Sequence, residues 1–223
     1  MDRYIVIVAG GHGTRMGSAI PKQFLEIAHR PILMRTIETF CNFDKHIKII
    51  VVLPAEYIDF WRDLCAKFNF GIEHKVVSGG KERFFSVKNA LEYVPNDVVV
   101  GIHDAVRPFV SNETLKNVFH TAEKFGTAVP VMPATESVRR VCGENSEPLN
   151  RKEIFMVQTP QCFNSKLLKT AYNTTYNPLF TDDASVVELT LHEKINLTEG
   201  NIENIKITTP YDINFAEWLL TQK

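Results

Sequence analysis

The sequence predicts an α/β fold with a Rossmann-like, mostly parallel sheet flanked by helices and a protruding β-hairpin arm. Three observations support this prediction. Short β-branched apolar runs recur along the chain, segments of helical periodicity separate them, and one polar, turn-rich stretch interrupts the alternation. Strands that alternate with helices form βαβ units with right-handed crossovers, so their sheet is mostly parallel. We expect a single domain over residues 1–223, with the arm at about 135–158.

The expected strands are apolar at consecutive positions, which is typical of strands covered on both faces of a sheet. They span residues 4–8, 47–53, 98–103 and 127–132, with a short one at 76–77. Helical periodicity indicates helices at residues 32–40, 56–68 and 83–93. A further helix is expected behind Ser111, a good N-cap, with Glu113 in its first turn. Ligands of such sheets bind beyond the carboxyl ends of the strands, so the chemistry is expected just after each strand.

The arm is predicted from two short strand-like stretches that flank a polar tip, residues 143–146. An isolated hairpin is not stable in water and has to pack on something. Two interpretations stay open: the arm packs on a second subunit, or it folds onto its own domain.

Composition excludes several classes of protein. The formal net charge of −1 provides no basic field for nucleic acid or an anionic membrane. The four cysteines form no CxxC pair and no metal-ligand spacing, which suits a reducing compartment. The N-terminus does not resemble a signal peptide, and no apolar stretch approaches the length of a membrane span. We expect a soluble, cytoplasmic protein that binds anions through a local site.

The strongest local signal follows the first expected strand, in the run Ala9-Gly10-Gly11-His12-Gly13-Thr14-Arg15-Met16-Gly17. Glycines let a backbone turn tightly and present its N–H groups to phosphate oxygens. The run lacks the Gly-Lys-Ser/Thr of a Walker loop, and Met16 replaces a glycine of the dinucleotide fingerprint. It offers two cations instead, Arg15 and, shortly after it, Lys22. Fixed cations stabilise charge that develops on a polyphosphate under attack, whereas the alternative is a glycine-rich turn with solvated surface cations.

A carboxylate, Asp104, is expected at the carboxyl end of the strand at 98–103, inside the predicted ligand crevice. A carboxylate among phosphates needs a cation or a ribose hydroxyl as its partner. Mg²⁺ bound to a triphosphate is a natural one, because Mg²⁺ prefers few carboxylates together with phosphate oxygens. The alternative is a surface ion pair between Asp104 and Arg107. Arg107 precedes Pro108, which biases its backbone to extended geometry, and we expect it to orient Asp104 rather than to touch a substrate.

Several motifs in order give the chain a family resemblance. The first loop is followed by Pro21-Lys22-Gln23. The others are Gly79-Gly80-x-x-Arg83-x-x-Ser86-Val87, His103-Asp104-Ala105-x-Arg107-Pro108, Gln158-Thr159-Pro160-Gln161, Thr181-Asp182-Asp183-Ala184 and Asn204-Ile205-Lys206-Ile207-Thr208. Together they resemble the 2-C-methyl-D-erythritol 4-phosphate cytidylyltransferases of non-mevalonate isoprenoid biosynthesis, along almost the whole chain. Taken alone, Thr181-Asp182-Asp183 is also typical of a helix N-cap with first-turn acids.

The resemblance implies roles for individual residues. It implies that Arg15 and Lys22 are catalytic and that Asp104 is a possible metal ligand, the Mg²⁺ or other divalent cation being held otherwise by the CTP phosphates. It implies a nucleotide site formed by Ala9, Gly10, Gly11, Gly13, Gly79, Gly80, Ser86, Asp104 and Ala105. It implies that Arg151, Thr159 and Lys206 hold the acceptor phosphate. Because Arg151 lies in the arm, which in the family reaches into the partner subunit's site, a homodimer is implied as well. The nucleophile is a phosphate oxygen that is already ionised, so His12 and His103 are expected to have positional roles only.

The chain departs from the family pattern at three places. The first loop has Gly10 where alanine is common, Val106 stands where the family commonly has alanine, and Ser137 replaces threonine. Valine at the second of these places also occurs in ribitol 5-phosphate cytidylyltransferases, whereas the Arg83-Phe84-Phe85-Ser86 helix start favours methylerythritol phosphate. We therefore expect a cytidylyltransferase that joins CTP to 2-C-methyl-D-erythritol 4-phosphate and releases pyrophosphate. The alternatives are a ribitol 5-phosphate cytidylyltransferase and a nucleotide-binding regulatory protein without turnover.

Overall fold

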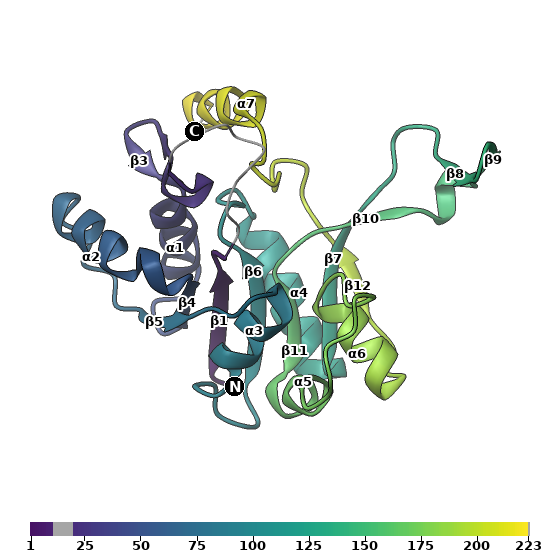
Figure 1. Ribbon diagram of the computed structural model, residues 1–223, viewed down its shortest axis with the longest axis horizontal. Coiled ribbons are helices and arrows are strands. Elements are labelled where there is room, and N and C mark those ends of the chain that lie inside the picture. Colours follow the sequence, from purple (N-terminus) through teal and green to yellow (C-terminus); the bar gives the residue numbers. More distant parts are fainter. Residues whose placement is uncertain (11–19, 223) are drawn as a thin grey trace.

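A computed structural model describes residues 1–10 and 20–222 (Figure 1). Its central sheet has the strand order β10-β7-β11-β6-β1-β4-β5, with β12 paired to β7. The parallel half contains β1 (Arg3–Val8), β4 (Lys48–Leu53), β5 (Lys75–Ser78) and β6 (Val99–Asp104). In the other half, β11 (Gln161–Asn164) runs antiparallel to both β6 and β7 (Thr127–Pro133), and β10 (Phe155–Val157) runs antiparallel to β7. The last strand, β12 (Leu197–Glu199), is parallel to β7.

Helices cover both faces of this sheet (Figure 1). One face packs against α1 (Ile32–Phe43), α2 (Ile58–Lys67) and α4 (Asn112–Phe125). The other packs against α3 (Arg83–Leu91), α5 (Ser165–Tyr172) and α6 (Asp183–Leu191). Successive residues of β1 alternate between the two cores, Ile5 and Ile7 in the first and Val6 in the second, and all three are fully buried. This is why the strand is apolar at consecutive positions.

A smaller third core lies above the carboxyl ends of the strands. It joins α7 (Pro210–Thr221) to the short hairpin of β2 (Glu26–Ile27) and β3 (Arg30–Pro31). Short 3₁₀ turns complete the secondary structure at Lys22–Phe24, Ala55–Tyr57 and Arg151–Glu153. No helix among the described residues is long and apolar enough to cross a membrane.

The α/β architecture predicted from the sequence is confirmed, with a mixed sheet in which parallel pairs predominate around β1. Each expected strand and helix is present within a few residues, although residues 55–57 form a 3₁₀ turn before α2. Ser111 caps α4 as expected, since its hydroxyl accepts a 3.0 Å hydrogen bond from the Thr114 N–H. Asp182 likewise caps α6, in a capping box with Ser185.

The protruding hairpin is present as β8 (Arg139–Cys142) and β9 (Asn145–Pro148), which pair only with each other in the described structure. Every residue of both strands is exposed, and the hairpin stands away from the sheet on the right of Figure 1. The chain returns from it through β10, the outermost strand of the sheet. The arm therefore does not fold back onto its own domain.

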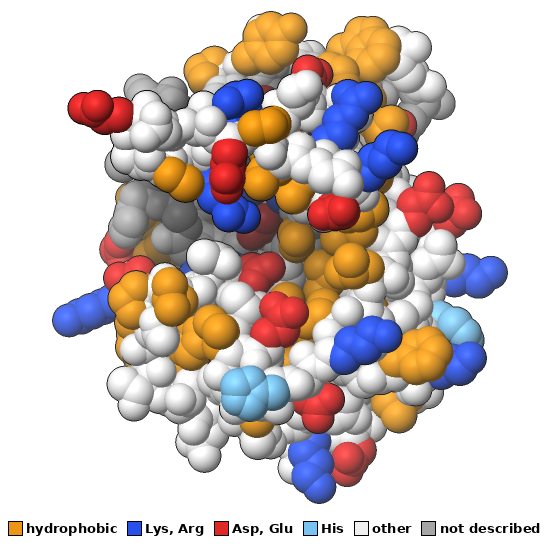
Figure 2. Space-filling model, turned by 90° about the vertical axis from the view of Figure 1, so that its right-hand side faces the viewer, with side chains coloured by type: hydrophobic (Ala, Val, Ile, Leu, Met, Phe, Trp, Pro, Cys, Tyr) orange, Lys and Arg blue, Asp and Glu red, His pale blue; other side chains and the backbone are white. Residues whose placement is uncertain are grey.

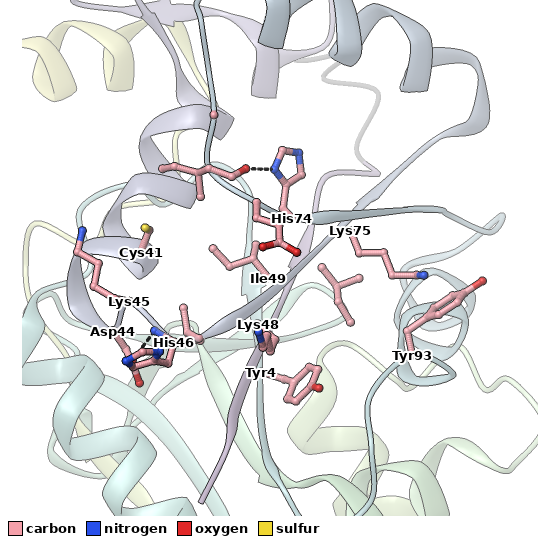
Figure 3. A pocket seen from close by; sticks show the side chains of 15 residues that line it. Tyr4, Cys41, Asp44, Lys45, His46, Lys48, Ile49, His74, Lys75 and Tyr93 are labelled. Atoms are coloured by element: carbon pink, nitrogen blue, oxygen red, sulfur yellow. Dashed lines mark hydrogen bonds between the residues drawn. The ribbon is translucent and has the colours of Figure 1, made fainter.

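A hollow of about 620 Å³ lies at the amino ends of the parallel strands, lined by the starts of β1, β4 and β5 (Figure 3). The Lys75 ammonium lies 4.0 Å from the centre of the Tyr93 ring. His74 bridges two neighbours: its Nδ1 is 2.7 Å from the Ile72 carbonyl, and its Nε2 is 2.9 Å from the Trp61 indole nitrogen. Because an indole N–H only donates, Nε2 of His74 must be unprotonated in this arrangement.

We predict that His74 makes the protein less stable in mild acid. Burial lowers the pKa of His74 below its ordinary value of 6.5, against the opposing effect of its hydrogen bond to Ile72. The unfolded chain then binds more protons, so this contribution to stability is complete above pH 6.5 and is lost as the pH falls below it. Urea unfolding at pH 7 and pH 5 measures how much the free energy of unfolding falls between the two pH values. This fall should be smaller for His74→Gln than for the wild type. His46→Gln, at an exposed position of the same hollow, should keep the wild-type loss. An unchanged pH dependence in His74→Gln would contradict the prediction.

Candidate active site

A cleft of about 290 Å³ opens at the carboxyl ends of β1 and β6. Loops far apart in the sequence form its walls: the end of β1, the turn at Lys22, the Gly80–Arg83 turn, the end of β6 and the segment at Lys206. Its lining includes Ala9, Gly10, Lys22, Gly80, Ser86, Asp104, Ala105 and Lys206. The structure thus brings together most of the described residues that the sequence analysis assigned to the nucleotide and the chemistry.

Asp104 is the last residue of β6, and its carboxylate is held by two cations. Arg107 Nε donates to Asp104 Oδ2 at 3.1 Å, and Lys206 Nζ lies 3.1 Å from the same oxygen. Burial alone would raise the pKa of Asp104, but Lys206, Arg83 and Arg107 together hold it well below its usual range. The cleft therefore contains a carboxylate whose ionised form is favoured by two neighbouring cations. The predicted ion pair with Arg107 exists, but it is not a surface pair, because both side chains are only 13% exposed.

A chain of hydrogen bonds lies behind this carboxylate. His103 Nε2 is 3.0 Å from the Arg107 carbonyl, which can only accept, so this nitrogen carries the proton. His103 Nδ1 then accepts from the Thr159 hydroxyl at 3.1 Å, and that hydroxyl accepts from the Asp104 N–H, also at 3.1 Å. Burial lowers the pKa of His103 to about 4, which keeps the ring neutral. The resemblance implies that Thr159 binds the acceptor phosphate. In this structure the Thr159 hydroxyl instead donates its proton to His103.

The wall formed by the turn before α3 requires glycine at one position. The Gly80 N–H donates to Ser86 Oγ at 3.1 Å, and Ser86 Oγ in turn donates to the Glu82 carbonyl at 3.2 Å. A Cβ at Gly80 would lie 2.4 Å from the Cβ of Phe85, closer than two non-bonded carbon atoms can approach. Gly79 continues the wall, since its N–H donates to the Leu53 carbonyl at 2.7 Å. Because the hydroxyl of the buried Ser86 already accepts one hydrogen bond and donates one, it has one lone pair left. The wall presents this lone pair and the adjacent backbone groups to the cleft.

Other predicted residues lie outside the cleft or outside the described residues. Gly11, Gly13 and Arg15, with His12 between them, lie outside the described residues. Arg151 is exposed on the arm, where its Nη1 donates to the Thr135 carbonyl at 2.9 Å, and it does not line the cleft. The sequence analysis gave no role to Arg83, although it lines the cleft. Its place three residues after Gly80, in the first turn of a helix that faces the strand ends, was the available signal.

A family model for 2-C-methyl-D-erythritol 4-phosphate cytidylyltransferase, IspD, matches residues 4–222 of the chain. The chain belongs to this family. The six-part motif pattern pointed to the same family, and membership makes the chain a nucleotidyltransferase rather than a regulatory binding protein. The ribitol 5-phosphate alternative is not favoured.

Relatives and solved structures agree with this assignment over the full length. The chain is 51% identical over 220 residues to the 2-C-methyl-D-erythritol 4-phosphate cytidylyltransferase of Bacteroides fragilis, covering 99% of this chain and 100% of the relative. It is 47% identical to that of Phocaeicola vulgatus, with the same coverage. The 4-diphosphocytidyl-2C-methyl-D-erythritol synthase of Anaerococcus prevotii has a similar fold, with a TM-score of 0.83 at 27% identity, covering 99% of this chain and 96% of that one.

Among the described residues, Asp104 is the one carboxylate of the cytidylyltransferase cleft that the sequence analysis named as a possible metal ligand. No group of three or more histidine, cysteine, aspartate or glutamate side chains is suitably placed within residues 1–10 and 20–222. The ionised Asp104 supplies carboxylate oxygen at the cleft, and a single carboxylate suits Mg²⁺ that arrives already bound to phosphate oxygens. The residues present therefore fit a metal that a nucleotide triphosphate brings with it.

We predict that Gly80→Ala weakens CTP binding by at least about tenfold, because the cleft wall has to move to relieve the contact with Phe85. Gly71→Ala is the matched control, since a Cβ at that exposed position meets nothing within 4 Å. Calorimetric titration with CTP and Mg²⁺ checks both variants. Wild-type CTP affinity in a folded Gly80→Ala variant would show that this wall does not contact the nucleotide.

Proposed function

We propose that this cleft joins CTP to 2-C-methyl-D-erythritol 4-phosphate and releases pyrophosphate, in line with the family's description as a 2-C-methyl-D-erythritol 4-phosphate cytidylyltransferase. The observation that carries the proposal is the ionised Asp104, which lies between Lys206 and the glycine wall at the carboxyl ends of the strands. A site for nucleotidyl transfer needs this combination: a carboxylate for the metal, cations for the phosphates and a close backbone wall for the base. Relatives with the same name at up to 51% identity support the choice of acceptor.

In the proposed reaction, an oxygen of the acceptor phosphate attacks the α-phosphorus of CTP in line. The new P–O bond forms as the bond from the α-phosphorus to the bridging oxygen of the β-phosphate breaks, and pyrophosphate leaves with the electron pair. Lys22, at the edge of the cleft, and Arg15 stabilise the charge that develops on the leaving group. Asp104 and the CTP phosphates would hold a divalent cation, which would supply further positive charge against the same developing charge. No general base is needed, which agrees with the neutral, fully hydrogen-bonded His103.

The two substrates are proposed to use opposite walls. The nucleotide is contacted by the end of β1 and the loop after it, by the glycine wall and by the residue after Asp104. These residues are Ala9, Gly10, Gly11, Gly13, Gly79, Gly80, Ser86 and Ala105. Lys206, whose side chain is 44% exposed beside Asp104, contacts the acceptor phosphate. Thr159 supports the acceptor side from behind Asp104. Arg151 is proposed to reach the acceptor phosphate from a second subunit, because in its own subunit it lies on the exposed arm.

We propose a homodimer assembled through the arm. The edge strand β10 exposes Phe155, Met156 and Val157, and its outer edge has no paired strand among the described residues. The face of the molecule on this side carries a band of apolar side chains beside a hollow (Figure 2). An open apolar edge invites aggregation unless another chain covers it, and a second copy can cover it in a closed, two-fold assembly.

We propose that the enzyme works in the cytoplasm, because its four cysteines are all free thiols. They are Cys41, Cys65, Cys142 and Cys162.

With CTP and Mg²⁺, the wild-type protein should release pyrophosphate when 2-C-methyl-D-erythritol 4-phosphate is added and not when the acceptor is omitted. Ribitol 5-phosphate at the same concentration should give little or no release. A coupled pyrophosphate assay measures all three conditions. Release with ribitol 5-phosphate alone would overturn the proposed acceptor, and no release with either acceptor would overturn the proposed reaction.

Lys22→Ala should lower kcat by about 10²-fold while changing the Kd for CTP far less, because a cation that acts on developing charge matters most in the transition state. Steady-state kinetics and calorimetry measure the two quantities separately. Lys48→Ala, at the start of β4 and far from the cleft, serves as the control. Equal losses in kcat and CTP affinity would instead make Lys22 a simple binding residue.

If the arm completes the partner's site, mixing two inactive variants should restore activity. In an equal mixture of Arg151→Ala and Lys22→Ala subunits, half of the dimers are mixed and each has one intact site, so about a quarter of the wild-type activity should return. Arg139→Ala, at a position whose side chain bonds to Ser146 within the arm, should by itself keep wild-type activity. Activity no higher than the mean of the two variants would place Arg151 in its own subunit's site.

A further inference from the structure

An ion pair with a fully buried carboxylate joins two helices at the edge of the cleft. Arg83, in the first turn of α3, donates from Nη1 and Nη2 to the two carboxylate oxygens of Asp183 at 2.9 and 2.6 Å. Asp183, in the first turn of α6, is fully buried, and its carboxylate also accepts from the Tyr172 hydroxyl at 2.7 Å. The two residues are 100 positions apart in the chain. A fork of two parallel hydrogen bonds fixes the guanidinium in position and in plane.

The surroundings of the pair leave Arg83 little freedom. Phe84 is buried next to it and stacks on Tyr172, with ring centres 4.8 Å apart. Asp183 is held from the other side, because the Gln161 side chain accepts from the Ala184 N–H at 2.9 Å and donates to Asp182 at 2.8 Å. The start of α6 is therefore tied to β11, which continues the segment that contains Thr159, and the start of α3 is tied to α6 by the ion pair.

Arg83 nevertheless faces the cleft. Its side chain remains 30% exposed and lines the cleft together with Gly80, Ser86 and Asp104. It is also one of three cations whose charges hold the pKa of Asp104 below its usual range. The turn that forms the glycine wall ends at Arg83, so the orientation of α3 decides where Gly80 and Ser86 lie.

We propose that Arg83, held by Asp183, is a positioning residue that sets the nucleotide wall of the cleft. This inference rests on the proposed use of that wall for CTP. The pair fixes the first turn of α3 against α6, and the first turn of α3 fixes Ser86 Oγ and the Gly80 N–H that it accepts from. Stability alone does not account for such a pair, because replacing a buried ion pair with apolar side chains of similar size is often neutral or stabilising.

The test separates position from stability with two variants. Arg83→Lys keeps the charge beside Asp183 but cannot form the planar fork. The double variant Arg83→Met with Asp183→Asn removes both charges, so no unpaired buried charge remains. Both variants should fold with a melting temperature close to that of the wild type. Both should bind CTP about tenfold more weakly by calorimetry without acceptor, since small displacements of a preorganised site cost affinity of this order. The KM for the acceptor should change less than twofold.

Arg3→Lys provides the matched control. Arg3 has a 29% exposed side chain and bonds to Glu123 at 3.0 Å, but at the opposite end of the sheet. It should leave CTP affinity unchanged. Folded Arg83→Lys and double variants with wild-type CTP affinity would overturn the positioning role and leave the pair as a structural element. If the wild type released no pyrophosphate with either acceptor, the proposed function would fail instead, so the two failures are distinguishable.

Discussion

The site depends on one electrostatic constraint: a carboxylate at the end of a buried strand has to be compensated. Asp104 ends β6, between β1 and β11, where water cannot solvate it fully. The desolvation of an ionised carboxylate costs several kcal/mol unless cations and hydrogen bonds replace the lost water. Lys206 and Arg107 supply the charges and Thr159 supports the backbone N–H of Asp104, so three distant segments have to meet at this point. The geometry needed for chemistry is thereby also a condition for folding.

Hydrogen bonds from side-chain amides bind these segments to each other. The Asn204 amide donates to Gln158 Oε1 at 3.1 Å and to the Thr159 carbonyl at 2.9 Å, while Arg107 donates to the Asn204 carbonyl at 2.7 Å. The turn at Gly200 approaches so closely that a Cβ there would lie 2.4 Å from Gln158 Oε1. Because Lys206 follows Asn204 by two residues, its ammonium is presented from a rigid base. The segment that carries Lys206 therefore owes its position to the neutral side chains of Asn204 and Gln158.

The sequence predicted the half of the fold that is governed by local pattern. The β-branched runs located the parallel strands, and Asp104 could be placed at a strand end because the run at 98–103 stops there. The strand β11 was not predicted, because its four residues pair antiparallel between β6 and β7, an arrangement set by long-range partners. The pair of Arg83 and Asp183 was missed for the same reason, since no local period connects residues 100 positions apart. The caps at Asn164 and at Thr209-Pro210 are local signals that would have located α5 and α7.

The arm makes few contacts within its own subunit. Within one subunit the cleft has Lys206 on its acceptor side, while β8, β9 and Arg151 stand in solvent and contribute no buried surface to their own domain. A hairpin of this kind gains nothing from folding alone, and the apolar edge of β10 beside it stays uncovered. The proposed dimer would correct both deficits, because it would cover the edge and bring a second cation to the side of the cleft where the acceptor phosphate is proposed to bind. The proposed dimer would thus couple catalysis to assembly, because the same contact that covers the apolar edge would add the second cation at the acceptor phosphate.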